Sequence, residues 1–178
     1  MNPKLEKLFV SLENDRLKLF QLLMDADEVT LRNSPRVGKW SVHQIVTHLF
    51  VSEKLSLGYM KKKSLGIETF ENSGWIESVK LLLLILSQRL PFKYKAPKSI
   101  VQHTPPDISL TEIQNQWSMM RVELKDFLNS IDDKNLKKKI YKHPRAGMLN
   151  VVQAITFFRE HYVHHRPQIE RLLKNKVQ

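Results

Sequence analysis

The chain has no cysteine, only five glycines and no long apolar run. The absence of cysteine excludes disulfides, thiolate metal ligands and a cysteine nucleophile, so any metal must be held by nitrogen and oxygen atoms. The most apolar run covers residues 81–86, far short of the roughly 18 residues that a membrane-spanning helix needs. The polar N-terminus lacks the apolar stretch of a signal peptide, so we expect a cytoplasmic protein with no membrane partner.

The scarcity of glycine, and the position of most prolines between periodic segments, favour helices over strands. Three capping-box patterns, in which Ser or Asn is followed three residues later by Gln or Glu, mark the starts of long helices. Asn2-Pro3 is typical of a further helix start. Together these signals predict long helices over about residues 3–26, 41–62, 109–130 and 150–174. A shorter accessory helix is predicted over 75–90.

The proline-rich segment 91–108 is predicted to be a long crossover connection between the accessory helix and the third long helix. Hydrophobic residues make up 42% of the 178 residues and charged residues 26%, which is typical of one globular domain spanning 1–178. The predicted fold class is therefore all-α: a four-helix bundle with a long crossover connection and an accessory helix. Such bundles build metal sites from side chains that face inward on neighbouring helices.

A candidate metal site follows from the histidines of the last predicted helix. His161 and His165 lie four residues apart, so they share one face of that helix. Bonds from zinc to histidine nitrogen are about 2.0–2.1 Å long, and this spacing allows both rings to reach one ion. The third ligand must come from another helix, and His48, at the edge of an apolar stripe, is the best candidate. A hydrogen-bonded core histidine is the competing interpretation for each of the three.

The other four histidines are weaker candidates. His164 lies to one side of the stripe, where it would replace a ligand or contact one. His43 lies in the first turn of the second helix and is expected to face solvent or to form a local cap. His103 lies in the proline-rich connection, and His143 precedes Pro144 in a predicted loop.

Two segments resemble the motifs of a known family. Residues 39–53 (KWSVHQIVTHLFVSE) are similar to the second-helix signature of the DinB-like superfamily, also called DinB/YfiT-like, in which a Trp-Ser pair precedes a histidine, a leucine and a glutamate. Residues 143–153 (HPRAGMLNVVQ) and 157–169 (FFREHYVHHRPQI) resemble its closing helix, where two histidines four residues apart precede a glutamine. The motifs stand in the expected order and cover about a quarter of the chain.

The resemblance implies a four-helix bundle that holds a divalent metal ion, often zinc or nickel, on three histidines. These correspond here to His48, His161 and His165. Members of the family include thiol transferases that use bacillithiol or mycothiol, and a mycothiol-dependent maleylpyruvate isomerase. This sequence departs from the pattern at two positions. Pro167 lies inside the last helix, where its missing amide hydrogen predicts a kink, and His43 stands where glutamate or aspartate is common.

The first functional hypothesis is an enzyme that transfers a low-molecular-weight thiol to an electrophilic small-molecule substrate. The metal would bind the thiol and lower its pKa. A metal-dependent hydrolase that uses metal-bound water is the variant of this hypothesis, and Glu53 and Glu160 are the carboxylates considered as partners of the ligands. The alternative is a non-catalytic helical binding or stress-response protein in which the metal is structural or absent.

The formal net charge of +11 indicates either a solvated, lysine-rich surface or attraction to an anionic partner such as an acidic substrate. The basic clusters 61–63 and 137–139 are not interleaved with aromatic residues as in a nucleic-acid platform, so nucleic-acid binding is not expected. Apolar residues in the region 75–94 form a candidate homodimer interface.

Overall fold

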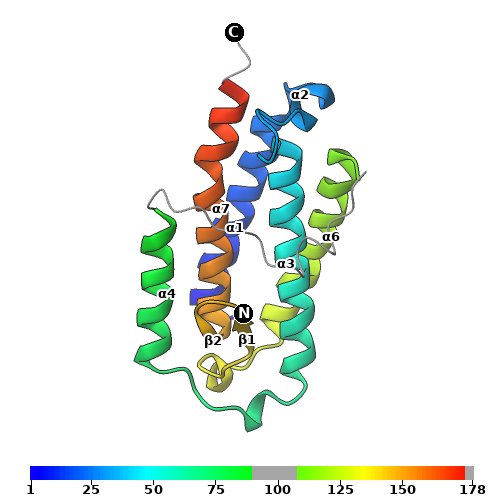
Figure 1. Ribbon diagram of the computed structural model, residues 1–178. Helices are drawn as coiled ribbons and strands as arrows, with labels where there is room; N and C mark the ends of the chain where they lie inside the picture. Colours follow the sequence, from blue (N-terminus) through cyan, green and yellow to red (C-terminus); the bar gives the residue numbers. More distant parts are fainter. Residues whose placement is uncertain (90–107, 175–178) are drawn as a thin grey trace.

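The computed structural model describes residues 1–89 and 108–174. Four long helices form the bundle drawn in Figure 1: α1 (Pro3–Leu23), α3 (Val42–Ser64), α6 (Leu110–Asn129) and α7 (Val151–Lys174). A shorter helix, α4 (Trp75–Gln88), stands at the edge of the bundle beside α7. The minor elements are α2 (Glu28–Arg32), the 3₁₀ turns η1 (Ile67–Thr69) and η2 (Asp133–Asn135), and the strands β1 (Tyr141–His143) and β2 (Gly147–Leu149). The predicted all-α bundle with an accessory helix is confirmed.

The predicted capping residues do start the long helices. The Ser41 hydroxyl accepts a hydrogen bond from the Gln44 amide, and the Gln44 side chain accepts one from the Ser41 amide. Asn150 and Gln153 make the same reciprocal pair at the start of α7. The Ser109 hydroxyl accepts from the amide three residues later, at 3.1 Å. Because these bonds are local, the sequence reveals them directly.

The start of α7 is also tied to the segment that leads into α4. The side-chain amide of Asn150 donates to the Ser73 hydroxyl at 2.5 Å, and that of Gln153 donates to the Ser78 hydroxyl at 3.0 Å. The first turn of α7 is therefore held at a fixed place in the fold by side chains as well as by packing.

The structure differs from the prediction at two places. The first helix ends at Leu23 rather than at residue 26, because Asp27 starts the separate helix α2 by accepting from the Thr30 amide at 2.7 Å. His143 does not lie in a loop: it ends β1, which pairs antiparallel with β2 through a turn completed by Gly147 at φ +80°. Strands of three residues are too short to show an alternating pattern. The predicted connection, with His103, lies outside the described residues except for residue 108.

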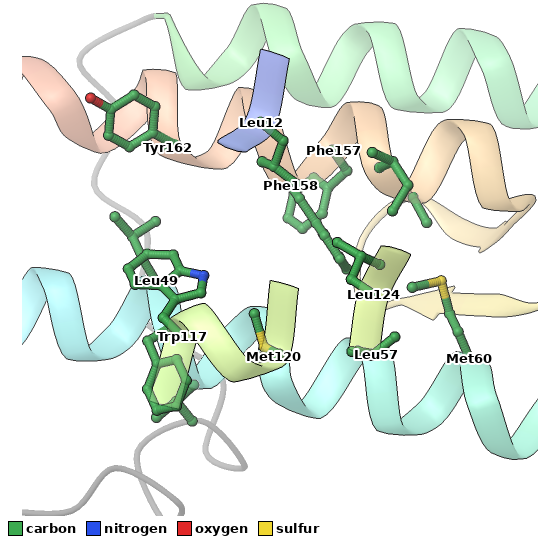
Figure 2. Close-up of a cluster of buried hydrophobic side chains, with 14 of the residues drawn as sticks. Leu12, Leu49, Leu57, Met60, Trp117, Met120, Leu124, Phe157, Phe158 and Tyr162 are labelled. Carbon is green, nitrogen blue, oxygen red and sulfur yellow. The ribbon is translucent and has the colours of Figure 1, made fainter. Parts of the chain in front are cut away.

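The core lies between the long helices. Figure 2 shows Leu49, Leu57 and Met60 of α3 facing the aromatic side chains of α7 across the bundle. Residues at helical spacing are buried on every long helix, and this burial of apolar surface is the main force that holds the bundle together. No helix of the described chain is both long enough and apolar enough to cross a membrane.

A buried ion-pair network joins α1, α3 and α6. One carboxylate oxygen of Glu53, on α3, accepts from the Arg121 guanidinium at 2.5 Å and from the Trp117 indole at 3.1 Å. Arg121 also donates to Glu13 of α1 at 3.2 Å, and Glu13 pairs with Arg16. Glu53 and Arg121 are each only 3% exposed, so their charges balance each other away from water.

Candidate metal centre

Helix α3 carries the first predicted ligand. Ile45 and Leu49 are almost fully buried, which turns this side of α3 toward the core. His48 lies at the edge of that buried face, is 7% exposed, and meets His161 of α7. The apolar stripe of α3 therefore fixes the direction of this imidazole.

Helix α7 carries the other two predicted ligands. His161 and His165 are one turn apart, and their ring centres lie 4.9 Å from each other. Phe157, one turn earlier, stacks on His161 at 5.4 Å with an interplanar angle of 14°. The α-helix continues past Pro167 to Lys174, so both histidines belong to one regular stretch ahead of the proline.

The three histidines form one cluster. One nitrogen from each of His48, His161 and His165 lies within 4.8 Å of the other two. The Nε2 atoms of His48 and His161 are 3.0 Å apart. Two nitrogen ligands of a tetrahedral zinc ion, at bond lengths near 2.05 Å, would be about 3.3 Å apart. The donor set therefore fits a small divalent cation with little movement.

The hydrogen bonds around the cluster are consistent with that fit. Nδ1 of His165 faces the Oε1 atom of Gln168 at 3.2 Å, and an amide oxygen can only accept, so the ring proton lies on Nδ1. The lone pair of His165 Nε2 is thereby left for a metal, as is usual for histidine ligands with an oriented second nitrogen. Nδ1 of His48 is buried and has no partner in the described part of the chain.

Burial keeps the three rings neutral. Burial, followed by repulsion from His164, lowers the pKa of His48 from 6.5 to about 4. Burial, followed by repulsion from His48, lowers the pKa of His165 to about 3. Burial also holds the pKa of His161 well below its ordinary value. At neutral pH each ring is neutral and keeps one lone pair, so a metal ion need not compete with a second proton on any of them.

Two aromatic side chains that were not predicted as site residues border the cluster. Trp40 lies 4.9 Å from the His48 ring and stacks on His165 at 6.3 Å. His143 packs 4.3 Å from Phe157, and its Nδ1 accepts from two backbone amides of the turn that follows β1. In the sequence, Trp40 belongs to the Trp-Ser pair of the first motif and His143 to the His-Pro pair of the second, and these pairs could have identified them.

Other candidates from the sequence lie elsewhere or do other work. His43 is not exposed: it is buried, and its Nε2 donates to the Ile108 carbonyl at 2.6 Å, because the chain entering α6 covers the start of α3. His164 contacts the predicted ligand His165, but its Nδ1 donates to the Gln88 carbonyl at the end of α4.

In the described part of the chain, neither candidate carboxylate forms a hydrogen bond or ion pair with the three predicted ligands. Glu53 is held by Arg121 and Trp117 in the buried network. Glu160 pairs with Arg89 and Arg159. Each carboxylate lies close to a predicted ligand in sequence, but its oxygens form ion pairs with arginines instead.

Fold and site together define a helical bundle with a candidate three-histidine metal centre between α3 and α7. A family model describing the DinB superfamily matches residues 11–169. The chain therefore belongs to the DinB superfamily, as the motifs indicated.

Two relatives extend over most of the chain. YfiT from Bacillus subtilis, whose description infers a metal-dependent hydrolase with an unusual four-helix bundle topology, superposes with a TM-score of 0.61 at 17% identity, over 96% of this chain and 86% of that one. A protein of Halalkalibacterium halodurans, whose name assigns it as a metal-dependent hydrolase by inference, is 21% identical to this chain over 162 residues. The match covers 88% of this chain and 78% of the length of that protein. At these identities the structural match establishes the fold.

A third similarity is local. One of the subunits of the ATP-dependent helicase/nuclease of Clostridium perfringens is 34% identical over 99 residues, which is 53% of this chain. The matched part is 8% of the length of that much longer protein. The similarity therefore says nothing about the activity of this chain.

Proposed function

We propose that this chain is a divalent-metal-dependent enzyme whose ion is held by His48, His161 and His165. The observation that carries the proposal is the convergence of three neutral imidazole nitrogens, from two helices, within 4.8 Å of one another. The metal-dependent hydrolase activity inferred for YfiT and for the Halalkalibacterium relative supports the same class, a metal-dependent enzyme. Imidazole suits both zinc and nickel, and these are the proposed ions.

The composition of the cluster favours a catalytic over a purely structural ion. Structural zinc sites use four protein ligands, whereas catalytic sites use three and keep one position open. Within the described residues, no aspartate or glutamate joins the three histidines. A bound divalent ion would supply Lewis-acid chemistry and would lower the pKa of a water or thiol at the open position.

Thiol transfer to an electrophilic small molecule is the reaction that this arrangement supports best. A hydrolase commonly needs a carboxylate or histidine as general base beside the nucleophile. Glu53 and Glu160, the nearest candidates by sequence, are both paired with arginines. A thiol needs no such base in a site that already favours the thiolate, and the net charge of +11 would help to attract an anionic thiol.

Hydrolysis is the second candidate, supported by the inferred names of the two relatives. In that reaction the same three histidines would hold the ion, and Trp40 and His164 would lie beside it, against His48 and His165 respectively. The two candidates differ in their need for an added thiol, so the purified, metal-loaded protein can be assayed with electrophiles in the presence and absence of a small thiol. Turnover that requires the thiol would favour transfer.

The metal centre is tested by mass-spectrometric metal analysis of protein purified without an affinity tag. We expect one divalent ion per chain, lost in the triple variant His48→Ala/His161→Ala/His165→Ala. The variant His43→Ala is the matched control, because His43 is equally buried but lies outside the cluster. Wild-type protein that takes up neither zinc nor nickel would refute the proposal and favour the non-catalytic binding protein.

A further inference from the structure

The two basic clusters of the sequence, residues 61–63 and 137–139, meet at one end of the bundle. This is the end at which the strands β1 and β2 lie (Figure 1). Phe70, from the segment that follows η1, contacts both clusters. The Lys63 ammonium lies over its ring, 5.4 Å from the ring centre, and the Lys138 ammonium donates to its backbone carbonyl at 2.7 Å. The fold therefore places an aromatic residue from a third segment against both clusters.

A cavity of about 200 Å³ opens between these segments. It is lined by five residues: Lys63, Phe70, Glu71, Lys139 and Met148. The ring of Phe70 and the thioether of Met148 supply apolar surface, and both side chains are half-buried. Sites for small molecules combine such apolar walls with a few polar groups. An apolar cavity of about 150 Å³ is enough to hold benzene, so this cavity has room for a single ring with a small substituent.

The two lysines that line the cavity differ in their partners. Lys139 is paired with Glu71 at 3.4 Å and with Glu77 at 3.2 Å. Among the residues that the structure describes, Lys63 forms no ion pair, and its ammonium lies over the aromatic ring of Phe70. The positive charge of Lys63 is therefore available to an anion that enters the cavity.

A further cation lies beside the cavity, on the β-hairpin. Lys142 is paired with Met148 across the ladder of β1 and β2. Residues directly opposite each other on antiparallel strands point to the same face, so the Lys142 side chain leaves the hairpin on the side of Met148. Lys142 is exposed, and no carboxylate of the described chain pairs with it. It adds to the positive charge that Lys63 supplies.

From these features we infer that the cavity binds a small aromatic anion, of the class of single-ring carboxylates. The ring would lie against Phe70 and Met148, since methionine sulfur packs well on aromatic rings, and the carboxylate would face the ammonium of Lys63. A ligand with both features is favoured over one that carries only the charge or only the ring. One aromatic side chain in a cavity cannot stack successive bases, so the arrangement does not suit single-stranded nucleic acid.

The cavity is separate from the candidate metal centre. Both involve α3, but Lys63 follows His48 by 15 residues, which is about 22 Å at a rise of 1.5 Å per residue. The residues that line the cavity include none of the three histidines. Binding at the cavity is therefore expected with or without a bound metal ion.

NMR of the methionine methyl groups tests the cavity, because Met148 lies in its wall. Benzoate is the probe. Acetate, which has the charge but no ring, and benzyl alcohol, which has the ring but no charge, are the comparison ligands. We expect the Met148 methyl signal to shift saturably with benzoate, with a Kd of about 1 mM, and acetate and benzyl alcohol to bind at least about tenfold more weakly. The methyl group of Met119, 61% exposed on α6, should not shift.

Lysine variants test the role of the charge. Lys63→Met keeps an unbranched side chain of similar length but removes the ammonium, and it should weaken benzoate binding about fivefold or more. Lys63→Arg keeps the charge and should retain most of the affinity. Lys62→Met is the matched control, because Lys62 is an exposed neighbour on α3 that does not line the cavity. This control should bind benzoate like wild type.

Four results would overturn the inference. Benzoate could leave the Met148 signal unchanged, or it could shift the Met119 signal equally, which would indicate general binding to exposed apolar surface. Acetate could bind as tightly as benzoate, or Lys62→Met could lose as much affinity as Lys63→Met, which would assign binding to the overall positive charge. The titration is made with and without added zinc, and binding that requires zinc would place the benzoate at the metal centre instead.

Discussion

Replacing Glu53 by alanine should destabilise the bundle more than any surface change. The substitution leaves the Arg121 cation 3% exposed, with only Glu13 as an ionic partner at 3.2 Å, and removes the acceptor of the Trp117 indole. Removing one member of a buried ion pair costs about 3–5 kcal/mol, and Glu13 offsets part of that cost. We therefore expect the free energy of unfolding to fall by about 3–4 kcal/mol, a large part of the 5–15 kcal/mol typical of a domain.

Urea denaturation followed by circular dichroism measures this loss, with thermal unfolding as a second readout. For a chain of this size each kcal/mol lowers the melting temperature by about 2–4 °C, so a decrease of roughly 10 °C is expected. Glu123→Ala is the matched control: it removes the partner of Lys61 in a pair exposed by 49% and 58%, and should cost less than about 1 kcal/mol.

A double variant separates the ion pair from simple loss of packing. In Glu53→Met/Arg121→Met both charges are removed and the space is filled by apolar side chains, which is often neutral or stabilising relative to a buried pair. The double variant should therefore be more stable than Glu53→Ala. If Glu53→Ala costs no more than the exposed control, or if the double variant is the less stable of the two, the reasoning about the buried charge is wrong.

Acidifying the metal-free protein from pH 6.5 to about pH 4 should lower its free energy of unfolding by about 3 kcal/mol through His48 alone. In that range His48 binds a proton in the unfolded chain but not in the folded one, because its folded pKa is lowered from 6.5 to about 4. Urea titrations at several pH values measure the slope. Nickel binding should quench the fluorescence of Trp40, whose ring lies 4.9 Å from His48. The substitution His143→Ala should cost about 2–3 kcal/mol, since it removes the acceptor of two turn amides and a ring packed on Phe157.

Each of these three predictions has a variant that can contradict it. His48→Gln should reduce the pH dependence of stability between pH 6.5 and about 4 by the share of one histidine, because the pKa values of His143, His161 and His165 are lowered as well; an unchanged slope would show that His48 does not contribute. Trp40→Phe should abolish the nickel-induced quenching, leaving Trp75 and Trp117 unaffected. His143→Asn should recover part of the stability lost in His143→Ala, because a short amide oxygen can accept from the same turn; equal losses would assign the effect to packing.

The sequence predicted those parts of the fold that depend on neighbouring residues. The reciprocal bonds of Ser41 with Gln44, and of Asn150 with Gln153, act within one turn, so the starts of α3 and α7 could be placed to within a residue. The face shared by His161 and His165 follows from helix geometry alone. The position of His48 beside them required the assumption of a bundle, which the apolar stripes justified.

What the sequence did not predict depends on residues far apart in the chain. His43 is buried where the chain passes at Ile108, 65 positions later, whose carbonyl accepts a hydrogen bond from the ring Nε2. Glu53 is held by an arginine 68 positions away, and Glu160 by one 71 positions earlier. Spacing within a helix says nothing about such partners, so a carboxylate near a ligand in sequence could not be told from one committed elsewhere.

Because the start of α7 is anchored, the number of residues between that start and the histidines determines the direction in which the histidines point. Asn150 is bound to Ser73, and His161 follows eleven residues later, very close to three turns of 3.6 residues. A single residue inserted between them would rotate His161 and His165 by about 100° around the helix axis, away from His48. The same insertion in the loop ahead of Ser41 would leave both ligand helices unchanged. Among relatives of this chain, conservation of this eleven-residue distance should therefore accompany metal binding more closely than overall sequence identity does.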